Sequence, residues 1–235
     1  MKKIKNIGAL LIFIVSLFGI GYASYNIIMW KVDTNTNNQI KKEVNKYVTK
    51  EDNTYKIDFK VLKERNSDVF GYLKVDGTNI DYIVLKTNNN DYYLNHNFDK
   101  NKNRAGWIFA DYHNKLDGSD QNIIIYGHNM RDGSMFGTLP SVLKKNWNNK
   151  ITFITEDNTY NYQVFSVYEI DDEDYYLKTS FNDDYDEFIK KLKLRSKYNY
   201  NVDITDTKQI ITLSSCIGNN QKRIVLHAKL IEEVE

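Results

Sequence analysis

A single cysteine, Cys216, lies at the end of a strand-like apolar run, and a positive charge follows it closely. The run covers residues 210–216, and Arg223, seven positions further on, opens a second apolar run, 224–231. If the two runs form adjacent strands, their ends bring a thiol and a guanidinium together. A nucleophile beside a fixed positive charge that stabilises an oxyanion is what a cysteine acyl-transferase requires. The alternative is that Cys216 is a small buried hydrophobic residue, as lone cysteines usually are.

Four histidines are candidates for the general base beside this thiol. His128 follows a four-residue apolar run and a glycine, so a buried strand would deliver it to the mouth of a loop. Catalytic side chains favour such strand ends, because the scaffold fixes them while the loop leaves them accessible. His227 lies inside the last apolar run and is predicted to be an ordinary strand residue, whereas His96 and His113 lie in polar segments. We therefore select His128 as the candidate general acid and base.

The composition favours one β-rich domain with an appendage. The 235 residues carry 32 basic and 31 acidic side chains, so no overall positive charge attracts nucleic acid. Tyrosine occurs 18 times and proline once, and 41% of the residues are hydrophobic, which suits a β-rich core. A mean hydropathy of −0.58 excludes a protein with many membrane spans.

The N-terminus is the apolar exception. Three lysines precede an apolar stretch at 7–30, and about 24 helical residues would reach ~36 Å, enough to cross a ~30 Å hydrocarbon core. The alternative is a signal peptide cleaved near Gly21-Tyr22-Ala23. The apolar residues continue to Trp30, which suits an interfacial anchor, so we favour an uncleaved transmembrane segment.

The lysines before this stretch predict a single pass through the cell membrane with the N-terminus in the cytoplasm. Residues 1–30 would then form the cytoplasmic N-terminus and signal-anchor, 31–54 a spacer with a juxtamembrane helix, and 55–235 an extracellular catalytic domain. Exported proteins normally use cysteines in disulfide pairs. A single thiol outside the cell is a liability unless its chemistry is needed.

Beyond the spacer, strand patterns dominate. An amphipathic helix is predicted around residues 40–48 and a short helix at 58–65, and a later helix carries Tyr185, Phe188, Ile189 and Leu192 on one face. Many short strands with few long helices predict a closed or nearly closed β-barrel. The acidic run 171–174 is predicted to be a solvated loop rather than a calcium site. The eight predicted strands are 70–75, 80–85, 107–110, 122–126, 151–155, 160–168, 210–215 and 223–231.

Several fragments together resemble the sortases, specifically class B, over roughly residues 55–231. Each fragment alone is weak, but their joint order and spacing are specific. The fragments are Asn-Ile-Asp-Tyr at 79–82, Asn-Asp-Tyr-Tyr-Leu-Asn-His at 90–96, Gly-Trp-Ile-Phe at 106–109, Ile-Tyr-Gly-His-Asn-Met at 125–130, Asp-Gly-Ser-Met-Phe at 132–136, and Thr-Leu-Ser-Ser-Cys at 212–216 followed by Arg223.

The resemblance implies a mostly β fold, an eight-stranded barrel with N-terminal helices and a helix before the cysteine strand. It also implies a transpeptidase that attaches surface proteins to the Gram-positive cell wall. Cys216 would attack the carbonyl of a threonine in a C-terminal sorting motif and form a thioester. His128 would protonate the leaving amine and deprotonate the incoming one, while Arg223 and the backbone N–H of Ile217 would hold the oxyanion.

The same resemblance suggests which residues bind substrate. Asn90, Leu94, Tyr126, Ser214 and Ile217 occupy positions similar to those that line the family's groove. For Leu94 and Tyr126 the alternative is core packing, and Asp111 is either an orienter of a histidine or part of a surface turn. The implied partners are surface proteins that carry a sorting motif and the amine of a lipid-linked peptidoglycan precursor, with no metal, cofactor or nucleic acid.

Two other functions share some of these features. A membrane-anchored cysteine peptidase would use the same residues but transfer the acyl group to water. A non-catalytic wall-associated binding module would keep only the barrel. The joint presence of Cys216, His128 and Arg223 favours the transpeptidase over the binding module, and only the identity of the acceptor separates it from the peptidase.

Overall fold

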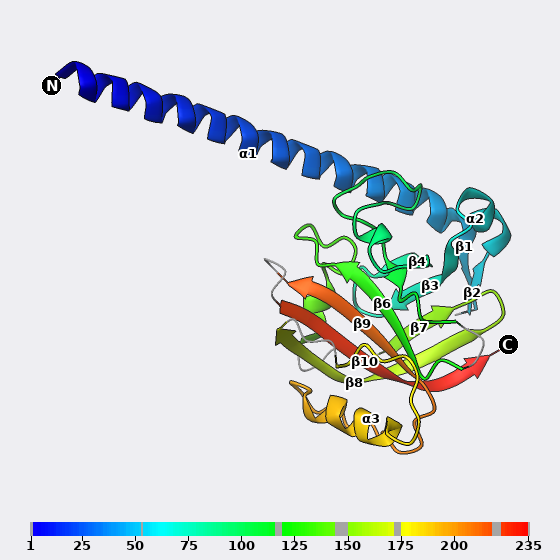
Figure 1. The fold of residues 1–235 in the computed structure, drawn as a ribbon. Coiled ribbons are helices and arrows are strands. Elements are labelled where there is room, and N and C mark those ends of the chain that lie inside the picture. The colour runs from blue at the N-terminus through cyan, green and yellow to red at the C-terminus, as the bar shows by residue number, and fades with distance from the viewer. Residues whose placement is uncertain are drawn as a thin grey trace.

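The strands close into a β-barrel. The computed structural model describes residues 2–52, 54–115, 119–143, 150–171, 175–217 and 222–234. Around the barrel the strands follow the order β10-β8-β7-β3-β4-β5-β6-β9 (Figure 1). Each corresponds to one of the eight predicted strands, which confirms the predicted fold class. Their bounds are β3 (Val69–Val75), β4 (Asp81–Leu85), β5 (Phe109–Ala110), β6 (Asn122–His128), β7 (Lys150–Ile154), β8 (Thr159–Asp171), β9 (Ile210–Ile217) and β10 (Lys222–Val234).

Two of the pairings that close the barrel are parallel, β4 with β5 and β6 with β9. The β6–β9 pair joins strands that are distant in sequence, and β7, β8 and a helix make the crossover between them. β9 and β10 then pair antiparallel along their lengths. The three strands β6, β9 and β10 therefore lie side by side in the barrel wall, with β9 in the middle.

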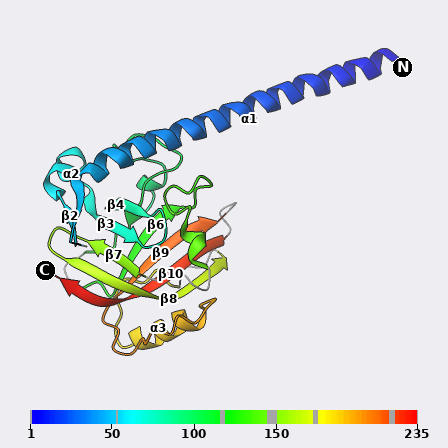
Figure 2. The ribbon, with the colours of Figure 1, turned by 180° about the vertical axis from the view of Figure 1, so that it is seen from behind.

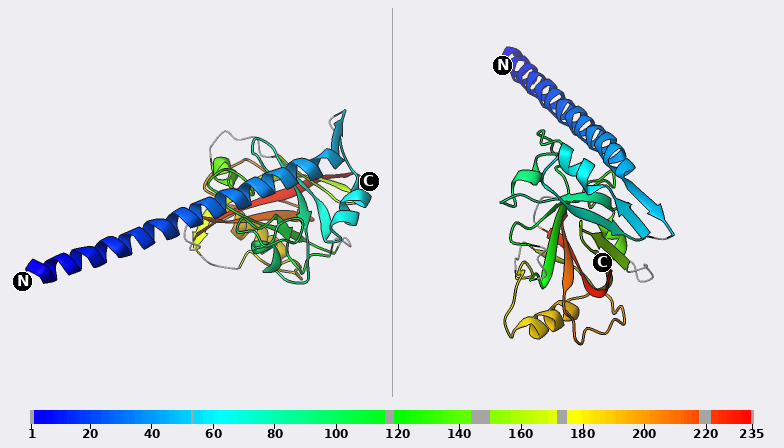
Figure 3. Two further views of the ribbon diagram at one scale, coloured as in Figure 1. Left: turned by 90° about the horizontal axis from the view of Figure 1, so that it is seen from above. Right: turned by 90° about the vertical axis from the view of Figure 1, so that its right-hand side faces the viewer.

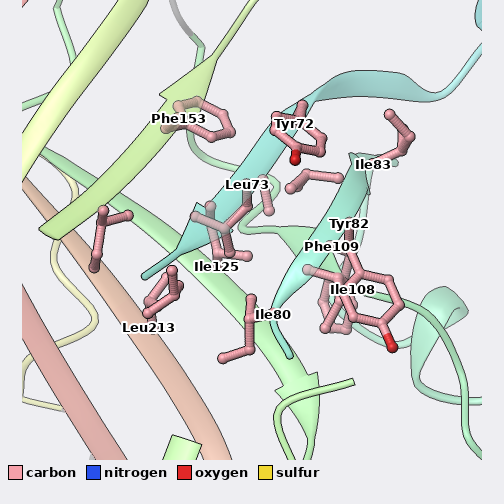
Figure 4. Close-up of a cluster of buried hydrophobic side chains, with 14 of the residues drawn as sticks. Tyr72, Leu73, Ile80, Tyr82, Ile83, Ile108, Phe109, Ile125, Phe153 and Leu213 are labelled. Carbon is pink, nitrogen blue, oxygen red and sulfur yellow. The ribbon is translucent and has the colours of Figure 1, made fainter. Parts of the chain in front are cut away.

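Apolar side chains fill the interior of the barrel. Figure 4 shows Leu73 of β3, Ile125 of β6 and Leu213 of β9 lying close together, and none of them is exposed to solvent. Burying one such side chain stabilises the fold by about 1.5–3 kcal/mol. The predicted strand at 107–110 shortens to two residues, and the Trp107 backbone N–H donates to the Tyr93 carbonyl at 2.9 Å, outside the barrel strands. The buried Trp107 indole N–H donates to the Ile83 carbonyl at 2.8 Å.

A second apolar cluster lies between the barrel wall and α3 (Tyr185–Leu194), which runs along the outside of β8 and β10 (Figure 2). The predicted face of this helix is the buried one. Its acidic residues lie in the first turn and two of its lysines, Lys191 and Lys193, in the last, the arrangement that complements the helix dipole. The buried helix residues are Tyr185, Phe188, Ile189 and Leu192.

The N-terminus forms one long helix, α1 (Lys2–Val44), which projects far beyond the barrel (Figures 1 and 3). The polar residues 31–39, predicted as a spacer, continue the helix. Thr34, Asn37, Ile40 and Val44 lie on its one buried face. The Asn37 amide donates to Asn103 Oδ1 and to the Gly106 carbonyl, so polar residues also dock α1 on the barrel.

The segment after α1 differs from the sequence prediction. A 3-10 turn, η1 (Asn45–Tyr47), leads into a hairpin of β1 (Val48–Glu51) and β2 (Thr54–Ile57), where Val48 was expected to be helical. The short helix predicted at 58–65 is confirmed as α2 (Phe59–Arg65), with the Asp58 carboxylate accepting from the Val61 N–H. Two 3-10 turns complete the described elements, η2 (Tyr92–Leu94) and η3 (Leu139–Leu143).

Candidate active site

The strand register brings three predicted catalytic positions side by side. His128 at the end of β6 pairs with Cys216 of β9, and Cys216 pairs with Arg223 of β10 on its other side. Neighbouring strands of a sheet lie about 4.7–4.9 Å apart. The cysteine position therefore lies between the histidine and arginine positions, although His128 is nearly ninety residues away in sequence.

A pocket of about 280 Å³ adjoins these positions. Four of the five predicted substrate-binding residues line it, namely Asn90, Leu94, Tyr126 and Ser214, together with His128 and Arg223. Ile217, the fifth, is the residue after Cys216 on β9 and pairs with Lys222. Sequence reasoning missed four lining residues: Asp91, Phe109, Gly127 and Leu177.

The backbone and ring of His128 are held from several sides. Its carbonyl accepts from the Met130 and Phe136 N–H groups, and Nε2 lies 2.8 Å from the Leu94 carbonyl oxygen. A carbonyl can only accept, so Nε2 carries hydrogen and the lone pair of the neutral ring is on Nδ1. The neighbouring Gly127 is packed so tightly that a Cβ there would lie 2.4 Å from Ile108 Cδ1. Glycine at this position keeps the strand end in place.

Asp111 holds one wall of the pocket. Its carboxylate is 3% exposed and accepts from the Tyr126 hydroxyl at 2.7 Å, the Asn90 amide at 2.8 Å, and both the backbone N–H and the ring of His113. Burial alone would raise the pKa of Asp111, but these hydrogen bonds outweigh it and hold the pKa below its usual value. Asp111 thus orients His113 and not His128, and because its carbonyl accepts from the Asn114 N–H at 3.0 Å it also opens a turn with two exposed residues.

Tyr126 both packs and lines the pocket. Its ring lies 5.3 Å from that of Phe109, centroid to centroid, which satisfies the core-packing alternative as well. Burial and the Asp111 carboxylate raise the pKa of Tyr126, whereas the charge of Arg223 acts in the opposite direction. The hydroxyl stays protonated and committed to Asp111, so Tyr126 presents its ring rather than an acid to the pocket.

Comparisons with known proteins agree with this geometry. A family model described as "Sortase domain" matches residues 73–231. Sortase B of Listeria monocytogenes is 42% identical over 178 residues, covering 72% of each chain. A crystal structure of sortase B from Bacillus anthracis in complex with AAEK1 superposes with a TM-score of 0.76 at 34% identity, covering 86% of this chain and 99% of that one. A Staphylococcus aureus sortase B–substrate complex gives 0.70 at 36% identity, covering 74% and 84%.

The chain belongs to the class B sortases. The family assignment extends across the barrel and agrees with the resemblance drawn from the sequence fragments. It establishes the general activity, that of a cysteine transpeptidase.

A buried network of side-chain hydrogen bonds holds the segment that contains Leu177. It runs from the Tyr168 hydroxyl to His227 Nε2 at 2.9 Å, and from His227 Nδ1 to Thr212 Oγ1 at 2.8 Å. Thr212 in turn donates to Asn122 Oδ1 at 2.7 Å, so its oxygen accepts from the histidine. His227 is therefore a neutral ring with hydrogen on Nδ1, and the prediction that it is a strand residue is confirmed.

The same network reaches the pocket wall. The Asn122 amide donates to the carbonyls of Tyr176 and Lys178, on either side of Leu177. The Tyr176 hydroxyl lies 2.9 Å from Ser214 Oγ, another pocket residue. Leu177 lies in a segment without strand or helix periodicity, which is why sequence patterns do not reveal it. The tertiary contacts of its neighbours place it in the pocket.

His227 should make this sortase less stable in mild acid. Complete burial lowers the pKa of His227 to about 3, against about 6.5 in an unfolded chain. The unfolded state alone binds this proton between those values, so stability falls as the pH drops below about 6.5. The loss reaches about 2 kcal/mol at pH 5. Denaturant unfolding at pH 7 and pH 5 should show a smaller pH effect in His227→Gln than in the wild type. Equal pH effects in both proteins would contradict this origin.

The acidic run 171–174 lies mostly outside the described residues. Within the part of the chain that the structure describes, no group of three or more His, Cys, Asp or Glu side chains is arranged to hold a metal ion.

Proposed function

We propose that this sortase cleaves a C-terminal sorting motif after threonine and transfers the surface protein to an amine of a lipid-linked peptidoglycan precursor. The observation that carries the proposal is the register that sets His128, Cys216 and Arg223 side by side at the edge of the pocket. These residue types are what an acyl transfer through a thioester requires.

In the first half-reaction the Cys216 thiolate attacks the threonine carbonyl carbon. Arg223 and the Ile217 N–H stabilise the oxyanion that develops. The peptide C–N bond then breaks, and protonated His128 gives its proton to the leaving amine. The product is a thioester between the surface protein and Cys216.

In the second half-reaction the incoming amine attacks the thioester carbonyl. His128 removes the proton from the attacking nitrogen as the new amide bond forms, and the Cys216 thiolate leaves. The nearby guanidinium favours the thiolate form of the cysteine in both halves of the cycle. The His128 Nδ1 lone pair is the one that would accept a proton, because Nε2–H is engaged by Leu94.

The lining of the pocket supports recognition of an extended peptide. Leu94, Phe109 and Leu177 supply apolar contacts, while Asn90 and Ser214 supply polar ones. The Asn90 amide group is itself fixed by Asp111 and by the Tyr112 N–H. A pocket with prearranged polar groups on an apolar wall suits a short sequence motif better than a general peptide.

The membrane topology belongs to the same proposal. Residues 1–30 form the cytoplasmic N-terminus and a single transmembrane anchor, residues 31–54 join it to the barrel, and residues 55–235 form the extracellular catalytic domain. The helical segment Gly8–Tyr47 contains an 18-residue stretch that is apolar enough to cross a membrane, and none of that stretch is buried. Both substrates are then presented at the surface to which the enzyme is tethered.

The test is intact mass spectrometry of the full chain in detergent after mixing with a library of sorting-motif peptides. We expect an adduct on Cys216 whose mass equals the peptide up to its threonine, and we expect an added amine peptide to remove it faster. An adduct that decays at the same rate with and without amines would indicate a hydrolase. A folded protein with an alkylatable Cys216 that forms no adduct would contradict the proposal.

A further inference from the structure

The long helix α1 carries aromatic residues where it would leave the bilayer. About 20 helical residues cross the hydrocarbon core, and counting from Ile7 places its outer edge near Asn26. Tyr22, Tyr25 and Trp30 surround this level. Tyrosine and tryptophan concentrate at the membrane interface. This inference rests on the membrane anchor of the proposed function, and it concerns what the barrel does at that interface.

A loop of the barrel reaches the same level on α1. Arg104 Nη1 lies 3.2 Å from Asn26 Oδ1 and 3.4 Å from the Asn26 carbonyl oxygen. The backbone N–H of Arg104 donates to Asp33 Oδ2 at 3.2 Å, and the side-chain amide of Asn103 donates to the Asp33 backbone carbonyl at 2.9 Å. The loop is thus fixed to α1 at two points that are about two helical turns apart. These contacts hold the Arg104 guanidinium at the expected depth of the lipid headgroups.

A pocket of about 370 Å³ opens between this loop and α1. The Arg104 side chain is 46% exposed, whereas Asp33, the one carboxylate in the lining, is 14% exposed and already paired with Arg104. Lys102 is exposed as well. The charge that faces outward is therefore positive. The lining residues are Met29, Asp33, Asn95, Lys102, Asn103 and Arg104.

We propose that this pocket binds the phosphate of an anionic phospholipid headgroup in the outer leaflet. A guanidinium and an ammonium together supply donors that match phosphate oxygens. The exposed Asn95 adds a neutral polar group, the buried Asn103 amide holds the loop to α1, and Met29 continues the apolar surface of α1 toward the acyl chains. Anionic lipid headgroups attract basic residues that lie close to a membrane span.

The bound headgroup would lie next to the catalytic pocket. Leu94 lines the catalytic pocket and its carbonyl accepts from His128, while the adjacent Asn95 lines the basic pocket. The ends of β6 and β9 also point to the side toward which the N-terminal half of α1 runs (Figures 1 and 2). Lipid binding would therefore hold the mouth of the catalytic pocket toward the bilayer, where membrane-linked substrates arrive.

The experiment titrates lipid into the full chain in detergent and counts bound lipids by native mass spectrometry. Phosphatidylglycerol and phosphatidylcholine with the same acyl chains are compared. We expect the wild type to prefer phosphatidylglycerol. Lys102→Gln, which leaves the contacts of Asn103 and Arg104 with α1 in place, should weaken that binding about fivefold, and Lys102→Gln with Arg104→Gln roughly 25-fold. The charge-conserving Lys102→Arg should bind as the wild type does.

The control is Lys190→Gln on α3, on the opposite side of the barrel from α1 (Figure 1); it removes the same charge and should leave lipid binding unchanged. Binding of phosphatidylglycerol within twofold of the wild type in the double variant would overturn the proposal. Displacement of the lipid by millimolar inorganic phosphate would also overturn it, because the pocket would then be a general anion site. Flotation of the chain with vesicles tests the anchor separately: loss of flotation refutes the anchor, not the pocket.

Discussion

Cys216→Ala should abolish acyl transfer in this class B sortase while leaving the barrel folded. The variant removes the one sulfur in the chain that can form a thioester. Loss of a catalytic nucleophile lowers turnover by about 10⁴-fold or more in enzymes of this kind. The measurement is the rate of product formation from a sorting-motif peptide and an amine peptide, together with the intact mass of the protein.

The fold should survive because Cys216→Ala only removes the thiol from a side chain at the end of β9 and leaves a methyl group. The backbone pairings of this position with His128 and Arg223 do not depend on the side chain. A denaturation midpoint close to that of the wild type therefore serves as the control. Turnover above about a hundredth of the wild-type rate would show that the thioester mechanism is wrong, since no other residue of this chain can carry that intermediate.

The barrel was predictable because its strands follow local rules. The strands predicted at 122–126 and 210–215 are largely apolar runs bounded by polar segments, and such runs are typical of buried strands. Composition alone did not give their order around the barrel. That order follows from the parallel pairing of β6 with β9, which joins segments more than eighty residues apart. The resemblance to a known family supplied what the local patterns lacked.

The N-terminal region shows where local rules fail. Residues 31–39 have no apolar periodicity, yet they are helical because Asn37 hydrogen bonds to the barrel and because no glycine or proline interrupts the helix. Val48 continues the apolar spacing of a helix, but it starts β1 because the chain turns back to pair with β2. In both cases a tertiary contact outweighs a weak local preference.

In the candidate site, too, some residues could be predicted from local sequence patterns and others could not. His128 and Cys216 end strands, and strand ends are visible in the sequence. Leu177 enters the pocket only because Asn122 holds the carbonyls on either side of it and Tyr176 lies against Ser214. Those contacts join β6, β9 and the segment before α3, so no pattern within the segment could reveal them.

Arg223→Lys should impair the reaction severely even though it keeps the positive charge. Arg223 lies beside the cysteine position, lines the pocket, and acts electrostatically on the Tyr126 phenol. A guanidinium holds its donors in a rigid plane, whereas an ammonium is a compact charge on a flexible chain and cannot reproduce that fork. Losing one oxyanion donor lowers kcat by about 10²–10³-fold, and we expect a loss of this size in both kcat and kcat/KM.

The division between kcat and KM separates the two roles open to Arg223. If the guanidinium acts on the oxyanion, kcat and kcat/KM fall together, because the interaction exists only in the transition state. If it only holds the substrate in the ground state, KM rises and kcat changes little. Lys222→Gln, which alters the exposed neighbouring residue on β10, is the matched control and should keep near-wild-type kinetics. Near-wild-type turnover by Arg223→Lys would instead mean that Arg223 supports the strand end without taking part in the chemistry.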